Sequence, residues 1–297
     1  MSNRGSWVGL LYAGVAVSLF SITPVFIRWA KELHPFVITC LRMWIGAGTV
    51  LAIAFVQGRG RLWLGPRLSR AQWARFASWG LVTALHFVFY ITSLDYTTVA
   101  HSLALVYTSP IWVSLCSRLL LGEPLPRSKW IGILVTLVGM GVLSGFEPNW
   151  TPRMLIGDAM ALGSAITFGL YSVTGRSQRD RYPLWRYAST VYAMAGLWLL
   201  PLAGWVWISQ VRTAGISERV GAALLSVLVL GVFPLGIGHT LYNAALRRTH
   251  PTRVNIVATQ EVTGGVLLSW WLLGEIPTLS ALIGAAIMLL GVTQVII

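Results

Sequence analysis

Ten apolar segments follow one another along the chain, most of them near the length of about 20 residues that a helix needs to cross a bilayer. Only 10% of the 297 residues are charged, against about 25% in soluble domains. Too few charges remain to cover a globular surface in water, so we expect the chain to fold in lipid. Each backbone N–H and C=O must then find its partner within its own segment, which predicts an all-α integral membrane protein.

The segments fall into two groups of five. The first group lies near residues 7–27, 35–56, 76–94, 98–121 and 130–146, and the second near 155–174, 185–209, 220–246, 254–273 and 279–297. They predict ten transmembrane helices. The first segment follows Arg4, as a signal peptide would, but it is longer than a typical signal core and has no convincing cleavage site. We therefore expect it to belong to the fold.

The two halves of the chain repeat each other. At an offset of 152 residues, Leu121, Gly122, Glu123, Gly132 and Gly139 recur as Leu273, Gly274, Glu275, Gly284 and Gly291. At an offset of 148, Gly9, Ala13, Phe20 and Arg28 recur as Gly157, Ala161, Phe168 and Arg176. Internal duplication in a membrane chain is typical of transporters. We predict one repeat over residues 1–147 and a second over residues 153–297.

Five helices per repeat is an odd number, so the second copy must enter the membrane from the opposite side. The sequence thus predicts an inverted repeat, an architecture that gives two similar conformations, each open to one side. Lys and Arg set the orientation, because cytoplasmic loops are enriched in them. Sixteen of the 22 lie at the N-terminus and in the even-numbered loops, and five lie on the other side. We predict a multi-pass protein of the cell (inner) membrane with both termini in the cytoplasm. The charge of +13 is explained by these loops, and no nucleic-acid binding is expected.

Polar groups inside the apolar segments mark the candidate binding site, because an ionisable group at bilayer depth must face protein or water. His86 and Tyr90 share one face of the third helix, and His239, Tyr242 and Asn243 share one face of the eighth. Tyr90 and Tyr242 are equivalent at the offset of 152. A stripe duplicated in this way suits a cavity that opens alternately to both sides. The alternative is hydrogen bonding between helices, worth about 0.6 kcal/mol per contact.

Glu261 is the one carboxylate well inside a helix. It could bind a substrate ammonium, carry a proton, or pair with Arg42 or a histidine, and the alternative is a purely structural ion pair. Aromatic residues near segment ends are expected in the interfacial belt. Those at mid-depth are candidates for a pocket that binds aromatic rings, and they are Phe87, Tyr107, Phe168 and Tyr171.

Prolines and glycines mark candidate hinges. Pro24 and Pro110 each remove a helical hydrogen bond, and each could be a hinge or a fixed kink. Pro234, together with Gly236 and Gly238, makes the eighth helix the most deformable by sequence. Glycine there could equally serve close helix packing.

The chain resembles the drug/metabolite transporter superfamily, in its ten-helix form built of two EamA repeats. The resemblance lies in the runs 107–110 and 118–123, in Leu-Leu-Gly-Glu at 272–275, and in Arg42 of the second helix. Within the superfamily the chain is most similar to the YddG-type aromatic amino-acid exporters. The resemblance implies that helices one, three, four, six, eight and nine surround a central cavity, with five and ten at the periphery. One departure is Val262, where the family often has a proline equivalent to Pro110, so symmetric helix bending is in doubt.

We predict a secondary transporter that exports small metabolites by alternating access, with amino acids including Phe, Tyr and Trp as the expected substrates. The alternative is another class of metabolite or drug. No GxxxxGK[ST] loop for an ATP-driven pump and no HExxH metalloenzyme motif occur. A channel, a scaffold or an enzyme fits the sequence less well, and we expect no metal or cofactor. Cys40 and Cys116 are expected to be small core residues. The expected partners are substrate and lipid, and one chain could act as a monomer.

Overall fold

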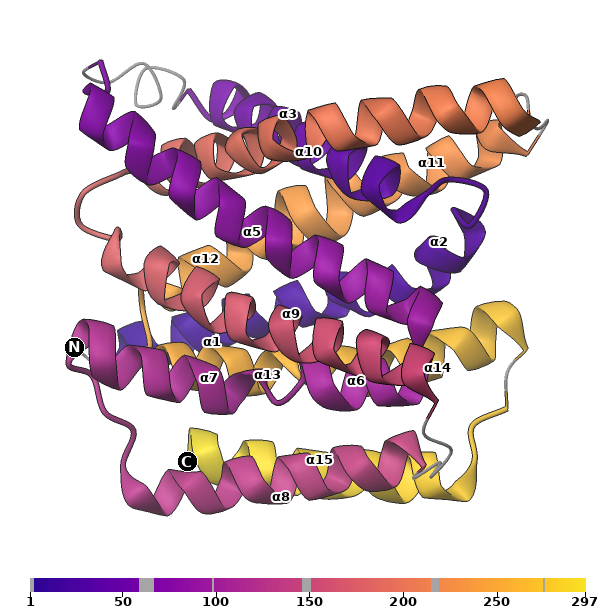
Figure 1. The fold of residues 1–297 in the computed structure, drawn as a ribbon. Helices are drawn as coiled ribbons and strands as arrows, with labels where there is room; N and C mark the ends of the chain where they lie inside the picture. Colours follow the sequence, from indigo (N-terminus) through magenta and orange to yellow (C-terminus); the bar gives the residue numbers. More distant parts are fainter. Residues whose placement is uncertain (1–2, 59–66, 98, 146–150, 215–218, 275) are drawn as a thin grey trace.

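The computed structural model describes residues 3–58, 67–97, 99–145, 151–214, 219–274 and 276–297. In these ranges the chain folds into helices and short connections, and no β-strand is present (Figure 1). The helices of the first half are α1 (Asn3–Phe20), α2 (Thr23–Trp29), α3 (Pro35–Val56), α5 (Arg70–Tyr96), α6 (Val99–Val106), α7 (Ser109–Cys116), the π-helix η1 (Ser117–Leu121) and α8 (Arg127–Ser144). Those of the second half are α9 (Pro152–Ser177), α10 (Leu184–Ala214), α11 (Val220–Leu230), the π-helix η2 (Gly231–His239), α12 (Thr240–Leu246), α13 (Pro251–Ala258), α14 (Glu261–Leu273) and α15 (Leu279–Ile296).

Eight helical stretches of the described chain are long and apolar enough to cross a membrane. They correspond to eight of the ten predicted segments. The other two predicted segments are α8 and the pair α13 and α14, which are not among the eight. The all-α membrane fold is therefore supported, and the number of ten spans stays a prediction.

Two of the predicted helices are broken where a proline follows. The chain turns at residues 21–22, between α1 and α2, and again at residues 107–108, between α6 and α7. Pro24 and Pro110 lie in the first turns of α2 and α7. A proline fits this position because its missing N–H has no intrahelical acceptor to lose there.

A third break, at residues 259–260 between α13 and α14, has no proline. It is nevertheless equivalent to the break at residues 107–108, at the offset of 152. The two segments therefore break at equivalent positions, although the second has Val262 in place of the proline. A threonine at each break donates to a carbonyl three residues earlier, from Thr108 Oγ1 to Leu105 and from Thr259 Oγ1 to Ile256, each at 2.7 Å. Such a hydroxyl competes with the backbone amide for its acceptor.

The repeated Leu-Gly-Glu sequence ends a helix in both halves. Gly122 has a φ of +66° after η1, and Gly274 has a φ of +71° after α14. A left-handed residue closes a helix by directing the next amide back to its last carbonyls, and glycine adopts it without a Cβ clash. This explains the glycine of the motif. Glu123 is described below, whereas Glu275 lies outside the described residues.

The helices α8 and α15, which occupy equivalent places in the two repeats, pack side by side and antiparallel (Figure 1). A Cβ added to Gly139 would lie 2.8 Å from the carbonyl oxygen of Gly284, and one added to Gly132 would lie 2.7 Å from that of Gly291. Gly132 and Gly139 are the repeat equivalents of Gly284 and Gly291. Each glycine thus faces the equivalent of the other, which is the pattern of contacts around a two-fold axis.

Two further pairs of equivalent predicted segments pack antiparallel, the second with the seventh and, through α7 and α13, the fourth with the ninth. Between α3 and α10, the Gln210 side chain donates to the carbonyl of Glu32 just before α3, and the Cys40 thiol donates to the carbonyl of Gly196. The later residue of α3 thus contacts the earlier residue of α10. Between α7 and α13, Ser109 bonds to Asn255 at 3.1 Å, and further along α7 a serine bonds to a threonine earlier in α13. The same two-fold relation therefore extends across the bundle.

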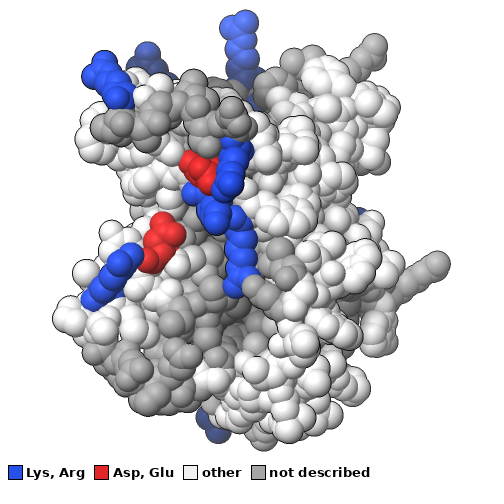
Figure 2. Space-filling model, turned by 90° about the vertical axis from the view of Figure 1, so that its right-hand side faces the viewer, with Lys and Arg blue, Asp and Glu red and all other residues white. Residues whose placement is uncertain are grey.

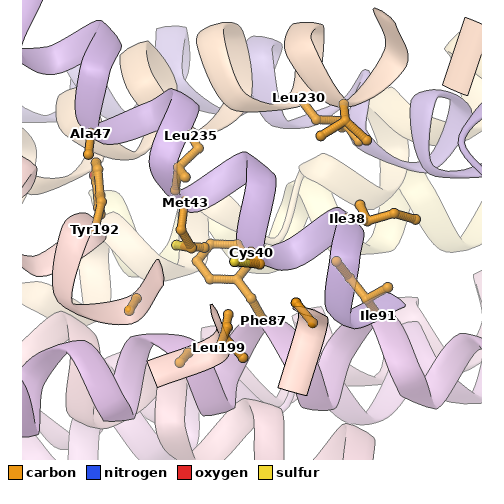
Figure 3. Packing of buried hydrophobic residues seen from close by; sticks show 14 of the residues in the cluster. Ile38, Cys40, Met43, Ala47, Phe87, Ile91, Tyr192, Leu199, Leu230 and Leu235 are labelled. Carbon is orange, nitrogen blue, oxygen red and sulfur yellow. The ribbon is translucent and has the colours of Figure 1, made fainter. Parts of the chain in front are cut away.

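A core of buried apolar side chains joins α3 to α5, α10, α11 and η2. Figure 3 shows Cys40 and Met43 of α3 close to Phe87 of α5, with Leu235 of η2 on the other side of Met43. Cys40 is a free, buried thiol in this core, as predicted, and Cys116 is a free, half-buried one.

The glycine contacts of α8 make a matched test. We predict that Gly139→Ala lowers the stability of the protein, because overpacking against a backbone typically costs about 1–3 kcal/mol. Gly141→Ala in the same helix is the control. Its Cβ would meet nothing within 4 Å, so helix propensity alone should stabilise it by up to about 1 kcal/mol. Thermal unfolding in detergent measures both, and equal melting temperatures for the two variants would contradict the packing.

Candidate functional site

A cavity of about 950 Å³ opens on one face of the bundle. We call this the cavity face; it carries the C-terminal ends of α2, α5, α10 and α14, and both chain termini lie toward the opposite, terminal face (Figure 1). Apolar residues of several helices line the walls, among them Ile27, Ile38, Ile91, Leu94, Trp205 and Val266. The cavity is large enough to hold a small molecule.

Charged side chains gather at the mouth of the cavity. Figure 2 looks onto this face and shows basic and acidic side chains close together near its centre. Those that line the cavity are Arg28, Lys31, Glu32 and Asp95. Mixed charges and an apolar interior together suit an amphipathic ligand.

The floor of the cavity is formed by Tyr90 of α5 and Glu261 of α14. Both also line a second, smaller space of about 40 Å³, which we call the recess. The recess is lined by the predicted site residues His86, Tyr90, Tyr107, Phe168, His239 and Glu261, and also by Phe20, Thr23, Arg42, Phe87, Val106 and Ala258. The structure therefore brings six of the nine predicted residues to one place.

Glu261 owes its position to the break in the ninth predicted segment. It is the first residue of α14, so it lies at the N-terminus of that helix, in the middle of the bundle. The partial positive charge of a helix N-terminus favours a carboxylate there. The Tyr107 side chain, at the equivalent break, hydrogen-bonds to Glu261. The two breaks thus place a carboxylate and a tyrosine side by side.

Arg42 of α3 faces the same recess. Its side chain is 1% exposed, and its guanidinium lies 4.8 Å from the centroid of the Phe87 ring. The Nε and one terminal nitrogen have no hydrogen-bond partner. Among the described residues no direct ion pair joins Arg42 to Glu261. A buried guanidinium with free donors is costly unless something binds it.

Aromatic rings surround the recess in a two-fold arrangement. The His86 ring stacks on Phe168 at 4.6 Å, and the His239 ring lies 4.4 Å from Phe20. Phe20 and Phe168 are repeat equivalents. His86 is fixed further by Ser164, whose backbone oxygen and hydroxyl lie 3.0 and 2.9 Å from its Nδ1. The two histidines lie one residue apart in the repeat alignment, so this wall of the recess is duplicated approximately.

The remaining three predicted residues, Tyr171, Tyr242 and Asn243, line neither space. Tyr242 is fully buried, and its hydroxyl lies 2.8 Å from that of Ser172. Asn243 donates to the Tyr171 hydroxyl at 2.6 Å and to the His239 carbonyl at 2.9 Å. For these three residues the structure shows the alternative to a cavity role, which is hydrogen bonding between helices. These residues fill the bundle between the recess and the terminal face.

An ion pair lies on the terminal face beyond them. Arg176 of α9 is 4% exposed and contacts the Glu123 carboxylate at 3.2 Å, while its other terminal nitrogen donates to the Leu246 carbonyl at 2.9 Å. Arg179 contacts the same carboxylate at 3.4 Å. His250 adds a backbone contact: its Nδ1 accepts from an amide of α13, so its Nε2 donates to the Glu123 carbonyl at 3.0 Å. Burial lowers the pKa of His250, which keeps this ring neutral.

The hinge candidates lie at three places. Pro24 lines the cavity, and Pro110 is buried just after the break in the fourth predicted segment. Pro234 lies inside η2, a π-helix, whose wide turns often occur at functional sites. A Cβ added to Gly236 would lie 2.7 Å from the side chain of Thr49 in α3, and one added to Gly238 would lie 2.9 Å from the ring of Phe20. Close packing therefore explains both glycines, and a hinge role stays a prediction.

Six residues of the recess were not among the predicted site residues, and two of them, Phe20 and Arg42, bear on its chemistry. Phe20 could have been found from the repeat, because its equivalent Phe168 was selected. Arg42 was predicted from the sequence only as a possible ion-pair partner of Glu261, since nothing in one helix shows what faces it. All six helices that the resemblance placed around the cavity contribute to the recess. The 950 Å³ cavity is lined in addition by α3 and α10, which the resemblance did not imply, and by Leu143 of α8 and Ala281 of α15, from the two segments that it placed at the periphery.

A family model described as the EamA-like transporter family matches residues 7–145 and again residues 155–297. The chain belongs to this family. It is therefore a multi-pass membrane transporter, and the resemblance seen in the sequence is confirmed.

Three curated relatives illustrate the range of the family. An uncharacterized transporter of Archaeoglobus fulgidus is 23% identical over 267 residues, 90% of each chain. The aromatic amino acid exporter YddG of Ancylobacter novellus is 25% identical over 78% of this chain and 77% of the relative. The pseudopaline exporter CntI of Pseudomonas aeruginosa is 25% identical over 95% of this chain and 94% of the relative. A solved crystal structure with 22% identity matches 99% of this chain and 96% of its own with a TM-score of 0.77, which shows a shared fold.

We predict that Glu123→Gln loosens the terminal face. Glu123 is 29% exposed, so its loss should cost about 1 kcal/mol, which corresponds to about a fivefold shift toward conformations open at that face. Spin labels at Arg127 and Ser177, on the two sides of the ion pair, should then show a larger population at longer distance by electron resonance.

Asp180→Asn is the control for that measurement. Asp180 also contacts Arg179, at 3.2 Å, but it is 84% exposed, and such surface pairs contribute little. Identical distance distributions for the Glu123→Gln, Asp180→Asn and unmodified proteins would rule out the ion pair as a closing element.

Proposed function

We propose that this chain is a secondary transporter of the inner (plasma) membrane that exports small metabolites, with amino acids including aromatic ones as its substrates. One observation carries the proposal. A cavity of about 950 Å³ runs from one face to the Glu261 carboxylate, Arg42 lines the recess that shares this carboxylate, and a buried arginine pairs with Glu123 on the opposite face. A membrane transporter needs such a site, reachable from one side at a time.

In this proposal ten helices form two inverted repeats, over residues 1–147 and 153–297. The antiparallel packing of three pairs of equivalent predicted segments supports this arrangement. Both termini are cytoplasmic, in agreement with the excess of Lys and Arg on the terminal face. The cavity face is then the outer face, and the structure represents an outward-open conformation.

Alternating access follows from the repeat. Tyr90 and Tyr242 are equivalent, yet Tyr90 lies at the cavity floor and Tyr242 is sealed on the terminal side. An inverted repeat produces the second conformation by exchanging the environments of its two halves. In the inward-open conformation Tyr242 would therefore be exposed to a cytoplasmic cavity and Tyr90 would be sealed.

Two features support amino acids as substrates. Aromatic rings line the cavity next to the charged pair, with Tyr90 at its floor and Trp205 in its wall, and such rings favour aromatic ligands by about 0.5–1.5 kcal/mol per contact. A relative with 25% identity is named as an aromatic amino acid exporter. The alternative is a different metabolite or drug, since another relative of equal identity is named as a pseudopaline exporter. Membership in a transporter family favours transport over enzymatic activity.

We predict that proteoliposomes containing the protein take up labelled Phe and Trp saturably. Tyr90→Ala and Tyr242→Ala should each raise KM about 3–10-fold, because each removes an aromatic contact in one of the two conformations. Tyr96→Ala, at an exposed position outside both spaces, is the control. Uptake equal to that of empty vesicles for every amino acid would refute the substrate class, and a parallel panel of other metabolites and drugs tests the alternative.

A further inference from the structure

The recess holds two opposite charges that do not neutralise each other directly. Glu261 and Arg42 both line this space of about 40 Å³, and Arg42 keeps two nitrogens without a hydrogen-bond partner. Among the described residues no ion pair joins them. Two charges at bilayer depth that face one space without closing on each other form a site for a ligand that carries both opposite charges.

We propose that this pair binds the head group of a zwitterionic substrate, with Glu261 on the α-ammonium and Arg42 on the α-carboxylate. The inference rests on the proposed transport of amino acids and adds how they are recognised. A guanidinium and a carboxylate form strong charge-assisted hydrogen bonds, often two in parallel. The Glu261 carboxylate accepts one hydrogen bond from Tyr107 and can accept further ones from an ammonium.

The sizes of the two spaces fix the orientation of the substrate. The recess has room for about three waters by the usual requirement of 10–15 Å³ each, which suits a head group and excludes an aromatic ring. The side chain of the substrate therefore projects into the 950 Å³ cavity, where Ile38, Ile91 and Val266 offer apolar walls. The head group alone is held by charges, so the site selects for the two α-groups and tolerates different side chains.

Three ligands with the same ring separate the two charges. L-phenylalanine carries both, phenethylamine lacks the carboxylate, and 3-phenylpropanoate lacks the ammonium. Hydrogen bonds between charged groups contribute about 1.5–3 kcal/mol, so isothermal titration calorimetry of the purified protein should show each analogue binding at least tenfold more weakly than L-phenylalanine.

The variants then assign each charge. Glu261→Gln should weaken L-phenylalanine at least tenfold and leave 3-phenylpropanoate unchanged or tighter, because that ligand has no ammonium to lose and is no longer repelled. Arg42→Gln should weaken L-phenylalanine and spare phenethylamine. Asp180→Asn, which removes an exposed carboxylate on the terminal face, should change neither. If Arg42→Gln does not fold, Glu261→Gln alone still decides, since its prediction is a change in ligand preference.

The outcomes distinguish this inference from the proposed function. If the unmodified protein binds and transports L-phenylalanine but binds phenethylamine and 3-phenylpropanoate equally well, the head-group site is wrong and amino-acid transport stands. The same holds if Glu261→Gln weakens L-phenylalanine and 3-phenylpropanoate by the same factor. If the unmodified protein binds and transports no amino acid at all, the proposed function fails, and this inference fails with it.

Discussion

Antiparallel packing between repeat-equivalent helices is the constraint on which the rest of the structure depends. In lipid each helix satisfies its own backbone, so the bundle must be held by close packing rather than by the hydrophobic effect. The glycines of α8 and α15 permit that approach, with Gly139 against Gly284 and Gly132 against Gly291. Once equivalent helices run in opposite directions, equivalent breaks meet in the middle of the bundle, and the site follows from them.

The breaks create the chemistry of the site. A continuous ninth span would place Glu261 within a helix, whereas the break at residues 259–260 gives it a helix N-terminus and a tyrosine neighbour. Arg42 lies across the recess with free donors and the Phe87 ring beneath it. Such charges are tolerated at bilayer depth only where water or a ligand reaches them. The cavity that provides this access ends at Tyr90 and Glu261.

Much of this arrangement could be predicted from the sequence, because periodicity and duplication are local properties. The breaks at Pro24 and Pro110 were visible, but the break at residues 259–260 was not, since it depends on how two helices meet. Six predicted site residues line the recess, whereas Tyr242 and its neighbours are sealed. A helical stripe shows which residues share a face, but it does not show which side of the membrane is open. The sequence offered Arg42 as one possible ion-pair partner of Glu261, but only the fold shows that both line one recess without forming that pair.

The central claim is that two five-helix repeats enter the membrane from opposite sides. Thiol labelling in intact cells tests it most directly, with Cys40 and Cys116 replaced by alanine and one cysteine introduced at Arg67 or at Arg219. Arg67 is exposed after the second predicted segment, and Arg219 is exposed after the seventh, at the equivalent place in the second repeat. A membrane-impermeant maleimide should label Arg219→Cys in intact cells and Arg67→Cys only after lysis. Labelling of both positions from the same side would contradict the account.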